Sequence, residues 1–169
     1  TKHYLVQHQT ERAKEMLHRL KEADIELFPE ALAMAKQAYE AQSDQQAYRE
    51  LLREAIELGA GASVAITLAQ HMIEQGEKQD AEKLVLDGLY RHPTMKSFQH
   101  LMKMQIQHAE DGQAKKSLNM LAELVEQQIK FRPSYRCVEC GFPSHTLYWH
   151  GPYCTSWGTV KRIKGLDGE

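Results

Sequence analysis

YRCVECGFPSHTLYWHGPYC, residues 135–154, contains all three cysteines of the chain. Cys137 and Cys140 form a C-x-x-C pair followed by glycine, a turn in which two thiolates converge on one metal ion while backbone amides point at the sulfurs. A four-thiolate zinc or iron site needs a second such turn. Here the second turn reads G-P-Y-C, with Gly151 in the place of its first cysteine and Cys154 as its last. The stretch therefore predicts a metal-binding double knuckle that lacks one protein ligand.

The missing ligand leaves three interpretations open. His150, or the more distant His145, supplies a fourth ligand and completes a Cys3His site, which zinc accepts readily. Alternatively, three thiolates hold the ion and water or an outside ligand completes the shell, an arrangement typical of catalytic zinc. In the third interpretation the site is weakened or empty. No ordered set of acid, base and substrate-pocket residues accompanies the cysteines, so we expect no enzymatic activity.

A redox-active cysteine pair is a further alternative for the C-x-x-C motif. Such a pair predicts a thioredoxin-like strand and helix around it. The Gly141-Phe142-Pro143 segment directly after the pair disfavours a helix at this point. The metal-knuckle interpretation is therefore preferred.

The end of the chain differs in character from the rest. Both tryptophans and all cysteines lie beyond Pro133, and helical periodicity disappears there. A unit of this size buries little core and usually needs a metal or a neighbouring domain to fold. We predict that residues 133–169 form a separate metal-binding module, called the knuckle module below.

Residues 1–132 show the apolar periodicity of amphipathic helices broken by short turns. One apolar stripe, from Ala31 to Tyr39, recurs 34 residues later from Ala65 to Ile73. Ser43 and Gln46 predict a capping-box start for the next helix. A period of about 34 residues in helix pairs is typical of tetratricopeptide repeats, which leave a concave surface for a partner. We predict a mainly α array of about three helix pairs plus a partial one; a plain helical bundle is the alternative.

Composition and charge exclude some functions. The net charge is −2 and the pI about 6.5, so no strong positive field exists to hold a nucleic-acid backbone. The only dense basic cluster, KRIK at 161–164, reads as a solvated tail. No apolar stretch reaches the length of a membrane span, and the polar start does not resemble a signal peptide. We expect a soluble chain; a membrane anchor upstream of it would not be visible in this sequence.

Several motifs together resemble a known family. RHPTM from Arg91, YRCVECGF, TLYWHGPYC and KRIKGLDG follow in this order, and this pattern is similar to the C-terminal part of the lipopolysaccharide assembly protein B family. The resemblance covers essentially the whole chain. It is most specific at the cysteine-rich end, whereas the helices before residue 85 resemble the family mainly in their repeat pattern.

The resemblance implies a fold and a function. The family consists of bacterial inner-membrane proteins with an N-terminal anchor, cytoplasmic tetratricopeptide repeats and a rubredoxin-like metal domain packed on those repeats. It implies a non-enzymatic regulator at the cytoplasmic face of the inner membrane, which cooperates with the protease FtsH in the turnover of LpxC, the deacetylase of the lipid A pathway. It also implies a response to the inner-membrane protein PbgA, also called YejM. The sequence leaves open whether the chain forms a homodimer.

The resemblance also assigns the metal ligands. Cys137, Cys140 and Cys154 match three of the four family ligands, and Gly151 stands at the fourth. His150 belongs to the TLYWH motif of the family even where the cysteine follows it. The implied cofactor is one iron or zinc ion, weakly bound or absent because of Gly151.

An alternative function is a generic scaffold whose zinc-ribbon end binds nucleic acid. Residues 135–169 contain only four Lys and Arg residues against three acidic ones. Ribbons that bind nucleic acid normally carry more positive charge. We therefore expect no nucleic-acid partner.

Overall fold

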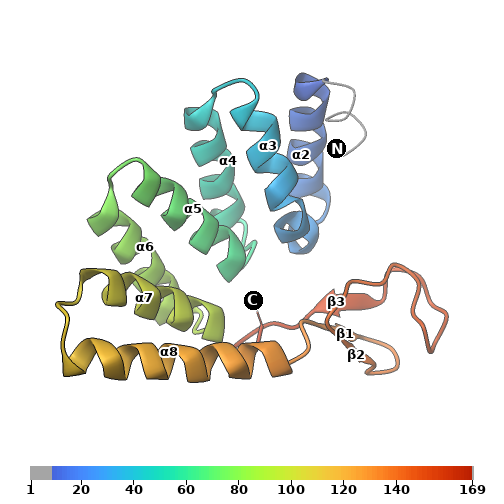
Figure 1. Ribbon diagram of the computed structural model, residues 1–169. Helices are drawn as coiled ribbons and strands as arrows, with labels where there is room; N and C mark the ends of the chain where they lie inside the picture. The colour runs from blue at the N-terminus through green and yellow to red at the C-terminus, as the bar shows by residue number, and fades with distance from the viewer. Residues whose placement is uncertain (1–8, 169) are drawn as a thin grey trace. The chain divides into compact units, whose positions relative to one another are not determined.

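The computed structural model describes residues 9–168 and shows helices followed by a small sheet (Figure 1). The predicted fold class, mainly α with a small module after the helices, is confirmed. Residues 1–8 of the predicted array and Glu169 of the predicted module lie outside the described residues. The elements in chain order are α2 (Thr10–Ala23), the 3-10 helix η1 (Ile25–Ala31), α3 (Leu32–Glu40), α4 (Gln45–Glu57), α5 (Ala62–Glu74), α6 (Lys78–Arg91), α7 (Met95–His108), α8 (Gln113–Phe131), β1 (Tyr135–Cys137), β2 (Pro143–Ser144) and β3 (Val160–Arg162).

The helices recur with the predicted period. α4, α6 and α8 begin at Gln45, Lys78 and Gln113, steps close to the roughly 34 residues of helix-pair repeats. The structure thus confirms repeated helices, while their assignment to the tetratricopeptide class stays a prediction. No helix among residues 9–168 is both long and apolar enough to cross a bilayer.

Two local details differ from the sequence-based expectation. The apolar stripe that starts at Ala31 does not begin an α-helix there, because η1, with Pro29 inside it, precedes α3. The N-cap of α4 is Asp44 rather than Ser43, and its carboxylate accepts a hydrogen bond from the Ala47 amide at 3.2 Å. Ser43 instead adopts a left-handed conformation with φ 56°. Asp is as good an N-cap as Ser, so the helix starts one residue later.

The chain divides into two compact units, residues 1–84 and 85–169. The division falls within α6, so that α7, α8 and the sheet belong to one unit. The change from helix to strand does occur near residue 132, since α8 ends at Phe131 and β1 begins at Tyr135. The finer division into domains 1–132 and 133–169 stays a prediction.

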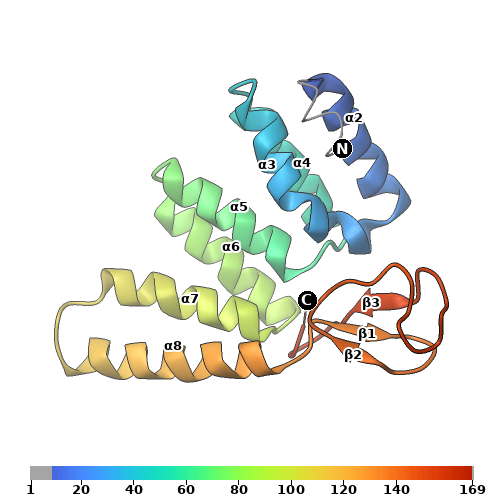
Figure 2. The ribbon, with the colours of Figure 1, turned by 45° about the vertical axis from the view of Figure 1, so that its right-hand side comes forward.

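The first unit buries apolar side chains from η1 and several helices. α2 packs against η1 and α3, α3 against α4, and α4 against α5, as the neighbouring ribbons in Figures 1 and 2 show. The buried Lys21 of α2 forms an ion pair with Glu54 of α4, so its charge is compensated. The largest fully buried side chains of the first unit are Phe28, Leu17, Leu51, Leu52, Leu68 and Val64.

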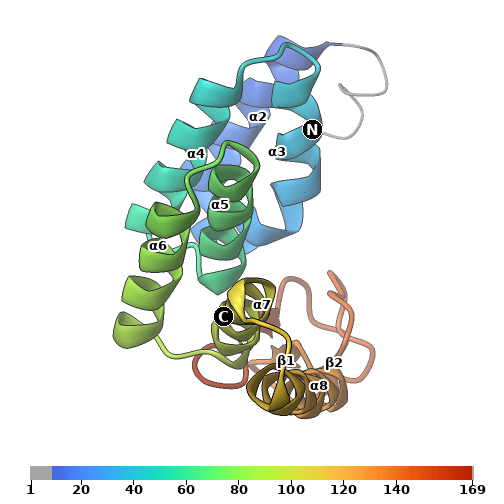
Figure 3. The same ribbon diagram turned by 60° about the vertical axis from the view of Figure 1, so that its left-hand side comes forward.

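The second unit contains a helical hairpin and the sheet. α7 and α8 lie side by side (Figures 1 and 3), and Met104 and Ala122 are buried. The sheet is antiparallel with the order β2-β1-β3, and Cys137 on β1 is paired with Val160 on β3. Short strands of this kind position the loops between them rather than forming a large core.

The end of the chain is attached to the start of α7. The backbone amide of Met95 donates a hydrogen bond to the carbonyl oxygen of Leu166 at 2.8 Å. Arg132, directly after α8, forms an ion pair with Asp167. These contacts join the knuckle module to the helical hairpin at two places.

Candidate metal centre

The structure brings the three cysteines together. Cys137 ends β1, Cys140 lies in the turn after it, and Cys154 lies in the second turn. Their sulfurs all lie within 4.8 Å of one another, and the Sγ atoms of Cys137 and Cys154 are 3.6 Å apart. All three are free thiols. This is the convergence that the C-x-x-C and G-P-Y-C motifs predict.

Both turns have the backbone of a knuckle. In the first, the amide of Gly141 donates to the carbonyl of Cys137 at 3.0 Å, and Gly141 has φ +74°, which glycine adopts without strain. In the second, the amide of Thr155 donates to the carbonyl of Gly151 at 3.0 Å. The second turn therefore keeps its shape although its first residue has no thiol.

Gly151 leaves little space beside Cys154. Gly151 is buried, and a Cβ atom at this position would lie 2.9 Å from the Sγ of Cys154 and 3.4 Å from the carbonyl oxygen of Ser156. Gly151 is not among the glycines with positive φ, so its backbone accepts an L-residue. A side chain here therefore requires a small shift of the Cys154 sulfur.

The predicted histidine ligands do not join the sulfurs. Among the described residues, no histidine, aspartate or glutamate belongs to the cysteine group. The ring of the exposed His150 packs against the ring of Trp157, with centroids 4.9 Å apart, and the two backbones form a bridge. His145 is also exposed. In this arrangement the site therefore has three protein donors.

Thr159 is a site residue that the sequence did not reveal. Its hydroxyl oxygen lies 3.4 Å from the Sγ of Cys137 and 4.0 Å from that of Cys154. Nothing in the local sequence distinguishes Thr159 from other threonines. Its place follows from the pairing of β3 with β1, which brings a residue far along the chain to the first knuckle.

The thiols of Cys137 and Cys140 have pKa values shifted in opposite directions. The backbone amide of Cys140, and then the hydroxyl of Thr159, lower the pKa of Cys137 to about 6. The backbone amide of Phe142 lowers the pKa of Cys140, but desolvation and the neighbouring Cys137 outweigh it, and the net pKa of Cys140 is raised. The hydrogen bonds therefore favour the thiolate form more at Cys137 than at Cys140, and any thiol that binds a metal ion gives up its proton.

The donor set fits a soft or borderline cation. Three thiolates favour zinc or iron, and the group contains no oxygen donors of the kind that magnesium and calcium prefer. Cys137, Cys140 and Cys154 would hold such an ion, which would crosslink the two knuckles.

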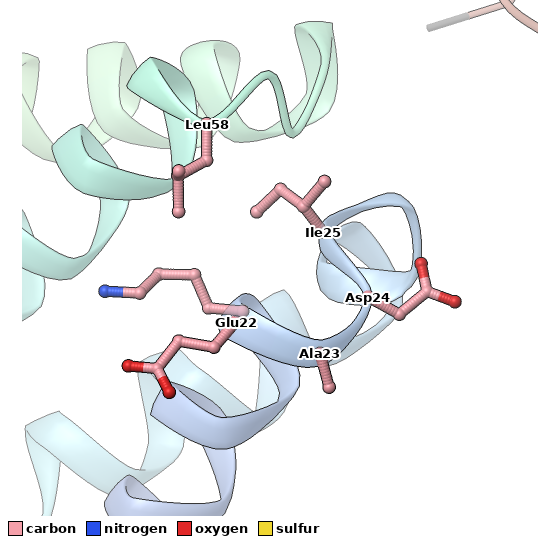
Figure 4. A pocket seen from close by; sticks show the side chains of 6 residues that line it. Glu22, Ala23, Asp24, Ile25 and Leu58 are labelled. Atoms are coloured by element: carbon pink, nitrogen blue, oxygen red, sulfur yellow. The ribbon is translucent and has the colours of Figure 1, made fainter.

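A separate hollow in the first unit is lined by apolar side chains and by a lysine whose charge is already paired. It has a volume of about 500 Å³ and lies where α2 passes into η1. Figure 4 shows Ile25 and Leu58 on its wall, with Glu22 and Asp24 at its margin. The charged end of Lys21, which also lines it, is paired with Glu54.

Comparisons with known proteins agree with this geometry. Residues 135–162 match the family model of the rubredoxin metal binding domain. The chain is 38% identical over 157 residues to lipopolysaccharide assembly protein B of Escherichia coli strain K12, covering 93% of this chain and 40% of that protein. It is 29% identical over 159 residues to the protein of the same name from Haemophilus influenzae strain KW20, with 94% and 40% covered.

The chain thus spans about 40% of the length of the curated relatives it matches. The family model covers the strands and both knuckles, including the position of Gly151. The alignments extend well beyond the knuckles into the helices. The resemblance to the lipopolysaccharide assembly protein B family, which the knuckle motifs predict, is therefore confirmed over nearly the whole chain.

Proposed function

We propose that this chain is a non-enzymatic docking part of a protein that regulates lipopolysaccharide synthesis. The observation that carries the proposal is the 38% identity over 93% of the chain to a protein named for lipopolysaccharide assembly. Repeated helices suit protein binding, because each helix pair buries its apolar face only against its neighbours and leaves the other face for a partner.

The proposed mechanism is the delivery of a target to a protease. The chain binds the deacetylase LpxC and presents it to the membrane protease FtsH, and the inner-membrane protein PbgA modulates this contact. An anchor outside this chain holds it at the cytoplasmic face of the inner membrane. In this mechanism the metal is structural: it holds the knuckle module, which in turn stabilises the start of α7 through the Leu166–Met95 hydrogen bond.

The helical hairpin offers a surface for such docking. α8 exposes four large apolar side chains, although it packs against α7 on another face. Contiguous exposed apolar side chains on a soluble domain are typical of protein contact sites. These residues, named the α8 apolar face here, are Met120 (60% exposed), Leu121 (52%), Leu124 (53%) and Phe131 (80%).

A pull-down from solubilised bacterial membranes tests the proposal. We expect the tagged chain to enrich both FtsH and LpxC over an unrelated helical-repeat protein of similar size and charge. A double variant, Leu121→Ser with Leu124→Ser, should reduce the recovery of LpxC. The matched control is Asn119→Ser with Glu123→Ser, which changes exposed polar residues on another face of the same helix. Enrichment of neither protein would contradict the proposal.

A further inference from the structure

The three-cysteine group leaves a metal ion one protein ligand short. Zinc and iron in thiolate sites are four-coordinate and tetrahedral. The described residues supply Cys137, Cys140 and Cys154 and no fourth His, Asp or Glu donor. Gly151, in the position of the first residue of the second knuckle, has no side chain to offer.

The neighbouring polar side chains are engaged elsewhere. The His150 ring packs on Trp157. The Oε2 atom of Glu139 accepts a hydrogen bond from the Ser156 hydroxyl at 2.5 Å. The Thr159 hydroxyl is neutral at physiological pH, and it contacts the sulfurs themselves, so it acts on the ligands rather than replacing one.

We propose that a metal ion held by Cys137, Cys140 and Cys154 keeps one exchangeable coordination position, and that this position binds an exogenous thiolate. The inference rests on the candidate metal centre and not on the docking function. Cys140 is exposed and Cys154 is half-buried, so the sulfur group is open to solvent on one side.

The chemistry of the donors selects the class of ligand. Three thiolates select a soft or borderline divalent ion, and such an ion accepts a thiolate as its fourth donor. With an ion bound, water would fill the position in the absence of another ligand. An incoming thiol would lose its proton to the solvent and bind the ion through its sulfur, and the water would leave. The product has the four-sulfur donor set that structural zinc and iron sites use.

The test uses the 169-residue chain loaded with Co²⁺, a spectroscopic substitute for zinc, and 2-mercaptoethanol as the probe. We expect the sulfur-to-cobalt charge-transfer absorption to grow by about one third as the thiolate count rises from three to four. In Gly151→Cys the full absorption should be present without the probe and should not respond to it. Gly151→Ala, which adds a Cβ but no sulfur, should keep the smaller absorption. Imidazole in place of the thiol should shift the d-d bands without adding charge-transfer intensity.

Several results would overturn the inference. One is an unchanged wild-type spectrum on addition of the thiol, and another is an equal response in Gly151→Cys. A change in the thiol-free spectrum of His150→Ala would show that His150 fills the position. Cobalt bound by Gly151→Cys but not by the wild type would mean that three cysteines do not retain the ion. If neither chain binds cobalt, the metal centre itself is wrong, whereas the docking function is decided separately by the pull-down.

Discussion

The helices of the first unit and the knuckle module are held together by different means. Six large side chains of the first unit are fully buried, and they are contributed by η1 and several helices. The core of the knuckle module consists of Tyr135, Cys137 and Val160, with Phe142, Leu147 and Cys154 packed against it. Two of these six residues are proposed metal ligands. Apolar burial therefore stabilises the first unit, while the knuckle module depends on its sulfurs and on its attachment to α7.

The exposed aromatic residues sharpen this contrast. Trp157 and Tyr153 are each 76% exposed, and Trp149 is 58% exposed. Aromatic side chains stabilise a fold mainly through the surface that they bury. Although the knuckle module contains both tryptophans of the chain, they add little to its core.

Removal of the metal should have the largest effect. Structural zinc supplies folding free energy on the order of 10 kcal/mol, and a module with so small a core cannot replace it. We expect a chelator to unfold the knuckle module while the helices of the first unit persist. Because Trp149 and Trp157 are the only tryptophans, tryptophan fluorescence reports on the module and far-ultraviolet circular dichroism on the helices. Loss of both signals together, or of neither, would contradict this division of stability.

A core substitution in the first unit should destabilise the helices and leave the knuckle module folded, the reverse of metal removal. Phe28 is completely buried, and Phe28→Ala should lower the free energy of unfolding by about 3–5 kcal/mol, because it removes apolar burial and leaves a cavity. We expect the helical transition to move to lower urea concentration, with little change in the tryptophan signal before unfolding. The matched control is Leu58→Ala, at a position that is 54% exposed, where the shift should be small. Equal shifts in the two variants would show that Phe28 is not a core residue.

The two regions also differ in how much the sequence predicts. In the helices, apolar periodicity reflects burial directly, so the stripes ending at Tyr39 and Ile73 correspond to helices in the structure. The start of α3 was not predictable in this way, because η1 depends on local backbone geometry around Pro29. In the knuckle module the C-x-x-C motif predicts the sulfur group, since the turn itself brings the thiols together.

Contacts between distant segments were not accessible from the sequence. The approach of Thr159 to Cys137 depends on strand pairing, and the Leu166–Met95 hydrogen bond joins segments far apart in the chain. Likewise, adjacency to Gly151 made His150 a candidate ligand, whereas the packing of its ring on Trp157 takes it away from the sulfurs. Spacing along the chain predicts local turns, but only the folded chain shows which side chains share a site.

Thr159 provides a smaller test within the knuckle module. Its hydroxyl contacts the sulfur of Cys137 and helps to lower the pKa of that thiol. Thr159→Val keeps the shape and removes the hydrogen bond, so metal affinity should fall about tenfold, the lower end of the effect of supporting residues around a metal. Thr159→Ser should retain most of the affinity. Competition with a chromophoric zinc chelator measures both; equal affinities in the valine variant and the parent chain would remove Thr159 from the site.

The smallest expected effect is on the pH dependence of stability, and it depends on His100 of α7. Burial, and then the nearby Lys103, lower the pKa of His100 from its ordinary value of 6.5, and its buried Nε2 atom has no hydrogen-bond partner among residues 9–168. The unfolded chain therefore binds this proton more readily than the folded chain, so the stabilisation is present above pH 6.5 and is lost as the pH falls below it. In the first unit, the hydrogen bond from Lys21 lowers the pKa of Glu54 from 4.5, and that contribution to stability is lost only at more acidic pH.

Urea unfolding measured at pH 7.5 and at pH 5.5 tests this difference. We expect the lower pH to reduce the stability of the α7–α8 hairpin before that of the first unit. His100→Leu should reduce this pH dependence, whereas His92→Gln, at an exposed position, should preserve it; the same slope in all three chains would show that another group is responsible.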